Sequence, residues 1–188
     1  QSLIYKVISL GMHKGGSFLV FLPGVGEIMK LCDTLNAKHK NYGDDGDNSS
    51  GGGNGDNKLL VLPLHGGLSS RDQLEVFKTP KRAVKVVVAT NIAETSITIP
   101  DCTVVIDSTR VKQTGFDASN RSSFLALDWA AQDALKQRQG RAGRVAPGIC
   151  FRLVPKSLYD WLPAHTIPEI SRIPLEELVL LVKANGYG

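Results

Sequence analysis

The chain has 188 residues, 42% of them hydrophobic and 21% charged, and a formal net charge of +4. This length suits one well-buried domain and is short for two, and the composition is typical of a soluble globular protein. The longest apolar runs are strand-sized, which argues against a membrane span, and no secretory signal is visible, so a cytoplasmic or nuclear location is expected.

Strand-sized apolar runs alternate with helical patterns along the chain, which is typical of a parallel sheet covered by helices. The predicted strands are 18–22, 59–62, 84–89, 103–107 and 149–153. The predicted helices are 3–12, 26–37, 70–77, 130–144 and 175–184. Residues 108–127 carry short extended pieces around a polar middle and predict a projecting β-hairpin. The expected fold class is α/β, with a parallel sheet between two layers of helices.

Residues 41–57 are nearly all Gly, Asp, Asn and Ser, and they bury too little apolar area to offset the entropy of ordering. We expect a mobile surface loop; a ligand-binding glycine loop is the alternative, but no GxxxxGK[ST] pattern is present. This segment holds four Asp and no Lys or Arg, so the rest of the chain carries +8, which favours phosphate-bearing partners.

The three cysteines, Cys32, Cys102 and Cys150, are odd in number, far apart and mostly flanked by apolar residues. This pattern indicates buried thiols rather than a disulfide framework or a CxxC metal site, and no structural metal is expected.

The segment 137–144, QRQGRAGR, places Gln137, Arg141 and Arg144 at i, i+4 and i+7. On a helix these side chains share one face, which can hold a polyphosphate. Arg138 points about 100 degrees away and is expected to be structural or an ion-pair partner. A solvated basic helix surface is the alternative.

The segment that follows the predicted strand 84–89 is rich in short hydroxyl and amide groups, TNIAETSIT. Reactive groups of open α/β sheets lie at the carboxyl ends of the strands, and side chains of this kind can donate to phosphate or ribose oxygens. For Thr90 and Asn91, helix capping is an equal alternative.

The strings TNIAETSITI and QRQGRAGR closely resemble motifs V and VI of superfamily 2 helicases of the DEAH-box/RHA group. LVFLPG at 19–24 is similar to motif IV, and 62–77 and 168–178 resemble the segments before motif V and after motif VI. The resemblance covers nearly the whole chain except 41–57. It implies the second of two RecA-like domains of an ATP-dependent RNA helicase.

On the nucleotide side, the resemblance implies that Arg141 and Arg144 are arginine fingers and that Gln137 orients the attacking water. Ser96 would sense the nucleotide state, and Thr98 would lie near the ribose or phosphates. Phe77 would stack on the base, which permits ATP and other NTPs; a core phenylalanine at a helix end is the alternative. Mg²⁺ would be held mainly by the first RecA-like domain.

On the nucleic-acid side, the resemblance implies backbone contacts to single-stranded RNA by Gly24, Thr90 and Asn91. Arg110 and Lys112 in the hairpin would lie near the strand, although a solvated basic face is equally open. Expected partners are the first RecA-like domain and the C-terminal domains of the same chain, with protein activators a further candidate class.

The implied function is RNA unwinding by 3′–5′ movement driven by ATP hydrolysis. The isolated chain is expected to be inactive, because it contains neither a GxxxxGK[ST] phosphate loop nor a DEAH tetrapeptide. The rival hypothesis is a catalytically silent RNA-binding or scaffold module with the same fold.

Overall fold

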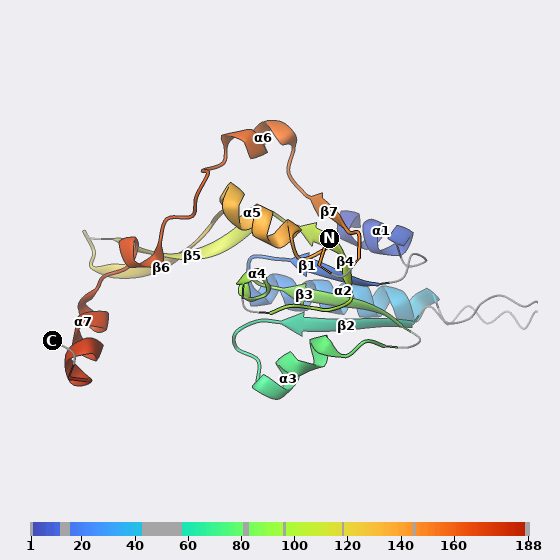
Figure 1. Ribbon diagram of the computed structural model, residues 1–188, viewed down its shortest axis with the longest axis horizontal. Coiled ribbons are helices and arrows are strands. Elements are labelled where there is room, and N and C mark those ends of the chain that lie inside the picture. Colours follow the sequence, from blue (N-terminus) through green and yellow to red (C-terminus); the bar gives the residue numbers. More distant parts are fainter. Residues whose placement is uncertain are drawn as a thin grey trace, which may run out of the picture.

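The computed structural model describes residues 2–11, 16–42, 58–80, 83–95, 97–117, 119–144 and 146–186. Ser96 and residues 43–57 of the predicted loop lie outside these ranges. The described residues form a five-stranded parallel sheet and a separate two-stranded antiparallel sheet (Figure 1). The predicted α/β class, with helices on both faces of a parallel sheet and a hairpin beside it, is confirmed.

The parallel sheet has the strand order β2-β3-β1-β4-β7. These strands are β1 (Ser17–Phe21), β2 (Lys58–Leu64), β3 (Ala83–Ala89), β4 (Cys102–Asp107) and β7 (Ile149–Arg152). In the register Ala89 lies beside both Leu64 and Phe21, and Asp107 lies between Phe21 and Arg152. The carboxyl ends of all five strands therefore meet at one edge of the sheet.

The central strand β1 is buried along its whole length, because both of its faces are covered. Phe18 and Val20 point into a cluster with α1 (Ser2–Gly11) and α2 (Val25–Tyr42). Leu19 and Phe21 point into a second cluster on the opposite face. This second cluster includes side chains from the 3₁₀ helix η2 (Glu75–Phe77), from α4 (Ile92–Thr95) and from the turn after α5 (Gln132–Gln139).

Helix α2 shows how sequence spacing builds the first of these layers. Ile28, Leu31, Cys32 and Leu35 follow the i, i+3, i+4, i+7 pattern, and each is at most 5% exposed. The helix runs to Tyr42, five residues beyond the predicted end. Helix α3 (Ser70–Leu74) is capped by Ser69, whose side chain accepts a hydrogen bond from the Asp72 N–H, and η2 follows the helix directly.

The predicted hairpin consists of β5 (Arg110–Asp117) and β6 (Ser122–Trp129), paired from Arg110–Trp129 to Asp117–Ser122. It extends away from the parallel sheet, toward η3 (Glu169–Ser171) and α7 (Glu176–Ala184) (Figure 1). Its base packs through Val111 and Ala130 against α5 and α6 (Lys156–Trp161). Within the described ranges, no helix is long and apolar enough to cross a membrane.

The prediction of one helix over 130–144 is wrong beyond residue 139. Helix α5 ends at Gln139, and the chain continues as a tight turn in which Arg141 N–H donates to Arg138 O and Ala142 N–H donates to Gln139 O. A later glycine makes room for this turn, because a Cβ on Gly148 would lie 1.7 Å from the carbonyl oxygen of Ala142. Helical periodicity alone does not predict such an approach.

Candidate functional site

The candidate site lies where the strands of the parallel sheet end. The Thr90 N–H donates to Leu64 O at 3.1 Å, which ties the residue after β3 to the end of β2. Asn91 follows, and its carbonyl accepts from the Glu94 N–H at 2.9 Å within α4. In the part of the chain that the structure describes, the side chains of Thr90 and Asn91 form no hydrogen bond, so the capping alternative has no support there.

A buried ion-pair network joins α5 to this edge. Arg138 is 2% exposed; its Nε lies 2.9 Å from Glu94 Oε2, and its Nη1 lies 2.9 Å from Asp107 Oδ1. Asp107 Oδ1 also accepts from the Thr109 N–H at 2.8 Å, whereas its Oδ2 is buried without a hydrogen-bond partner in the described ranges. The expectation that Arg138 is an ion-pair partner is confirmed.

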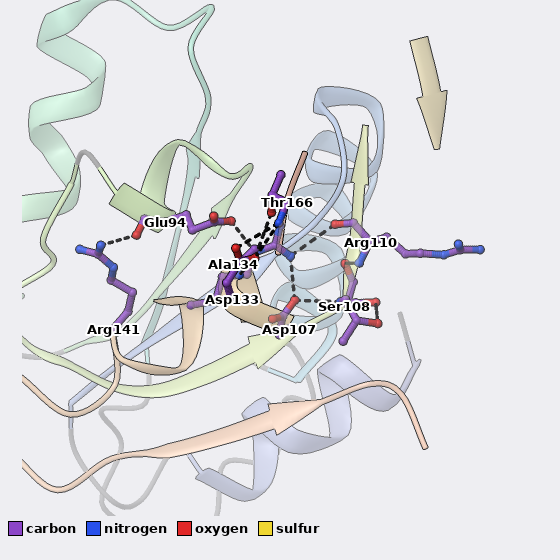
Figure 2. A network of polar contacts seen from close by, with 10 residues as sticks. Glu94, Asp107, Ser108, Arg110, Asp133, Ala134, Arg141 and Thr166 are labelled. Atoms are coloured by element: carbon purple, nitrogen blue, oxygen red, sulfur yellow. Dashed lines mark hydrogen bonds and ion pairs between the residues drawn. The ribbon is translucent and has the colours of Figure 1, made fainter. Parts of the chain in front are cut away.

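Arg141 lies on the other side of α4 from this network. Its guanidinium donates to the carbonyl oxygens of Glu94 and, at 3.3 Å, of Ile97. In Figure 2, Arg141 points toward the backbone of Glu94, whose side chain extends the opposite way, toward α5. Burial lowers the pKa of Arg141, as does the positive charge of Arg144, while Glu94 opposes the shift. Its Nε is buried and finds no hydrogen-bond partner among the residues that the structure describes.

Arg144 is exposed, and its Nη1 donates to the hydroxyl oxygen of Thr98. Two of the predicted nucleotide-site residues are therefore in contact. Gln137 lies on the exposed side of α5 and, among the described residues, its side chain forms no hydrogen bond with either arginine. The shared helical face predicted for Gln137, Arg141 and Arg144 does not form, because the helix ends at Gln139.

Phe77 is the last residue of η2 and is 39% exposed, so it is not a core residue. Its neighbour Val76 is fully buried in the second cluster, where Ala142 also lies. The η2 turn and the 140–144 turn therefore border the same hydrophobic cluster, on the face of the sheet opposite α1 and α2.

A pocket of about 170 Å³ opens beside the ion-pair network. Its lining includes Asn91 and Glu94, Lys112 and Thr114 of β5, and Arg172, which donates to Thr114 O at 3.1 Å. The structure thus brings Asn91 and Lys112 to one pocket.

Lys112 also forms an ion pair with Glu27 at 3.0 Å, and this pair packs over Gly24, where a Cβ would meet Lys112 Nζ at 2.6 Å. Three candidates on the nucleic-acid side, Gly24, Asn91 and Lys112, are therefore near one another. Arg110 is placed differently, because its guanidinium stacks 3.8 Å from the ring of Trp129.

Several residues of this region were not among the predicted site residues. The sequence pattern could have indicated Asp107, since it is an acid at the end of an apolar strand, where functional groups of α/β sheets gather. Glu94 lies inside the motif V string, but its pairing with a residue 44 positions away has no signal in one sequence. The sequence likewise gives no local indication that Arg172 belongs to this region.

The three cysteines are free, with Cys32 and Cys102 buried and Cys150 partly buried. Across the described ranges, no three His, Cys, Asp or Glu side chains gather as metal ligands.

Comparison with known proteins matches residues 2–146 to the helicase conserved C-terminal domain. The chain is 44% identical over 178 residues to the DExH-box ATP-dependent RNA helicase DExH1 of Arabidopsis thaliana, covering 94% of this chain and 17% of that protein. It is 43% identical over 177 residues to the human ATP-dependent DNA/RNA helicase DHX36, covering 94% and 16%. Each relative is thus about six times as long as the stretch that it shares with this chain.

Among solved structures, the Escherichia coli DEAH/RHA helicase HrpB superposes with a TM-score of 0.78 and 32% identity, over 97% of this chain and 22% of that one.

Proposed function

The chain belongs to the helicase conserved C-terminal domain family, and from this premise we propose that it is the second RecA-like domain of an ATP-dependent RNA helicase of the DEAH/RHA type. The observation that carries the proposal is the pair Arg141 and Arg144 on one turn, the first anchored to two carbonyls and the second exposed beside Thr98. A neighbouring first RecA-like domain would supply the phosphate loop and hold Mg²⁺.

In this proposal Arg141 and Arg144 stabilise the charge that develops on the transferred phosphoryl group. The exposure of Arg144 supports contact with a triphosphate, and Arg141, which is 8% exposed, lies on the same turn. Gln137 would reach the attacking water from the exposed side of α5, and Ser96 and Thr98 would respond to the nucleotide from the segment after α4. None of these steps needs a metal ligand from this chain.

The ring of Phe77 would stack on the base of ATP. Its exposure of 39% and its place at the end of a turn leave one face available to a ligand. Stacking on an aromatic ring does not depend on the identity of the base, so other NTPs would also be accepted.

Single-stranded RNA would follow the carboxyl edge of the sheet and contact Thr90, Asn91, Gly24 and Lys112 through its phosphates and sugars. The unpartnered side chains of Thr90 and Asn91 support this assignment, and Arg110 would contribute from the base of the hairpin. Closure of the two RecA-like domains on ATP and their release after hydrolysis would move the strand, in the 3′–5′ direction by resemblance.

The test uses the full-length protein with Arg144→Ala and Arg141→Ala. We expect kcat for ATP hydrolysis to fall by about 10³ to 10⁵ in each, the usual effect of losing an arginine finger. Lys136→Ala is the matched control, because it removes an exposed cation of α5 that lies only one residue before Gln137. Thermal melting monitors folding of all three variants.

Turnover of Arg144→Ala within about threefold of wild type, at unchanged melting temperature, would remove the finger assignment. A wild-type full-length protein that binds RNA but hydrolyses no ATP would instead favour the silent RNA-binding module. The isolated 188-residue chain should show no hydrolysis under either hypothesis.

A further inference from the structure

Lys85 is an unusual residue for its position. It lies in the middle of β3 between valines, in the sequence AVKVVVA, and its side chain is 0% exposed. Lysine is almost never fully buried unless its charge is paired, because moving an ammonium group out of water is costly. A valine would complete this strand without that cost, so the amine has to be explained by its contacts.

Two hydrogen bonds and one ion pair surround the ammonium group. Lys85 Nζ donates to Val76 O at 2.8 Å and to Lys78 O at 3.0 Å, and it lies 2.6 Å from Asp101 Oδ1. The carboxylate balances the charge, while one carbonyl comes from Val76 within η2 and the other from Lys78 directly after it. The amine therefore ties a surface turn to the centre of the sheet.

The two carbonyls belong to the residues on either side of Phe77. The turn itself is a single 3₁₀ turn, closed by one hydrogen bond of 3.2 Å from the Lys78 N–H to Glu75 O. Of its three side chains only Val76 is buried, and the ring of Phe77 is 39% exposed. The ring is therefore only partly held by packing, and the backbone on both sides of it is held by Lys85.

We propose that Lys85 is the positioning residue for Phe77, fixing the turn so that the ring is presented to the nucleotide base. The inference rests on the proposed base-stacking role of Phe77 and adds a buried residue that acts only through it. Lys85 then governs affinity for the base portion of the nucleotide and leaves phosphoryl transfer at Arg141 and Arg144 unaffected.

The experiment compares Lys85→Met and Phe77→Ala in the full-length protein. Lys85→Met keeps the volume of the side chain and removes the three polar contacts, so KM for ATP should rise by about 2- to 12-fold, the range of an impaired ring contact, with kcat within twofold of wild type. Phe77→Ala should raise KM by about 5- to 100-fold, since the stacking partner is lost entirely. The double variant should match Phe77→Ala alone.

Two controls separate positioning from a general loss of stability. Lys78→Met removes an amine from the same turn, but this one is 70% exposed and, of the described residues, pairs with the Glu75 carboxylate, so KM should stay at the wild-type value. Inhibition by tripolyphosphate, which has no base, should be equal in wild type and Lys85→Met. A purely structural defect would change that inhibition or lower kcat.

A lower melting temperature of Lys85→Met with unchanged KM, while Phe77→Ala raises KM, would overturn the inference and leave the proposed function intact. An unchanged KM in Phe77→Ala would instead remove the base-stacking role and the inference together; the Arg144→Ala result stands apart from both. Should Lys85→Met fail to fold, Lys85→Gln retains two donors, and an unchanged KM in that folded variant would be equally decisive against the proposal.

Discussion

The Arg138 network predicts a large loss of stability when its guanidinium is removed. Arg138→Met keeps an unbranched side chain in the site but leaves Glu94 and Asp107 without their cation. Asp107 is 0% exposed and Glu94 only 16% exposed in its side chain, so water cannot replace the lost partner at Asp107. Breaking a buried pair in this way typically costs about 3–5 kcal/mol.

Smaller contributions act in the same direction. The guanidinium lies 5.2 Å from the ring centroid of Phe21 and also contacts Arg110 O at 3.4 Å. Both contacts are near the outer limit of their range and add little to the ion-pair term, so we expect a total near 4 kcal/mol, on the order given for a broken buried pair. The free energy of unfolding of a single domain is about 5–15 kcal/mol. The variant should therefore still fold, but it should unfold at a lower urea concentration than the wild type.

Equilibrium urea unfolding of the 188-residue chain, followed by circular dichroism, measures this change. The midpoint should fall while the m-value stays constant, because the surface exposed on unfolding is the same. Lys156→Met is the control: it breaks the ion pair between Lys156 and Asp160, two exposed side chains 3.5 Å apart, and should leave the midpoint unchanged. A loss below about 1 kcal/mol for Arg138→Met would refute the reasoning, because a surface pair contributes that much.

Three further predictions concern the site and the core. Thr90→Ala in the full-length protein should reduce RNA-stimulated ATPase activity more than basal activity, since it would remove only the proposed backbone contact to RNA; equal losses of the two rates would contradict that contact. The thiols should be unreactive in the native state: burial raises the pKa of Cys32 and Cys150 to about 11 and of Cys102 to about 12, from 9.0. At pH 8 roughly one thiol in a thousand is then ionised, so labelling by a disulfide reagent should be slow until guanidinium unfolds the chain. Because the folded-state pKa values are raised, the thiols favour the folded state below pH 9.0 and lose that contribution as the pH rises toward 11 or 12, so the urea midpoint should fall over that window. Rapid native labelling at pH 8 would show that the thiols are accessible.

Local patterns predicted the sheet well. The strand-sized runs lie where the structure has β1, β2, β3, β4 and β7, because a strand buried on both faces needs an uninterrupted apolar sequence. The hairpin was predicted from its polar middle, and both of its strands lie within two residues of the expected bounds.

The site was predicted less completely, because its geometry depends on contacts between distant residues. Arg138 pairs with residues 44 and 31 positions away, and no local pattern indicates either pairing. The helix over 130–144 was overextended because helical spacing continues through Gly140, whereas the chain there turns. Lys85 was visible as an interruption of a valine run, but the carbonyls that it binds belong to a turn seven to nine residues earlier.

Glu94 contacts one arginine through its main chain and another through its side chain, so the two contacts respond differently to substitution at position 94. Arg141 binds the main-chain oxygen of Glu94, which every amino acid has, whereas Arg138 binds the carboxylate. Substitution of Glu94 would therefore weaken the ion pair that anchors α5, but it would keep the main-chain hydrogen bond to Arg141. Two arginines three positions apart in one motif thus come under separate selective constraints.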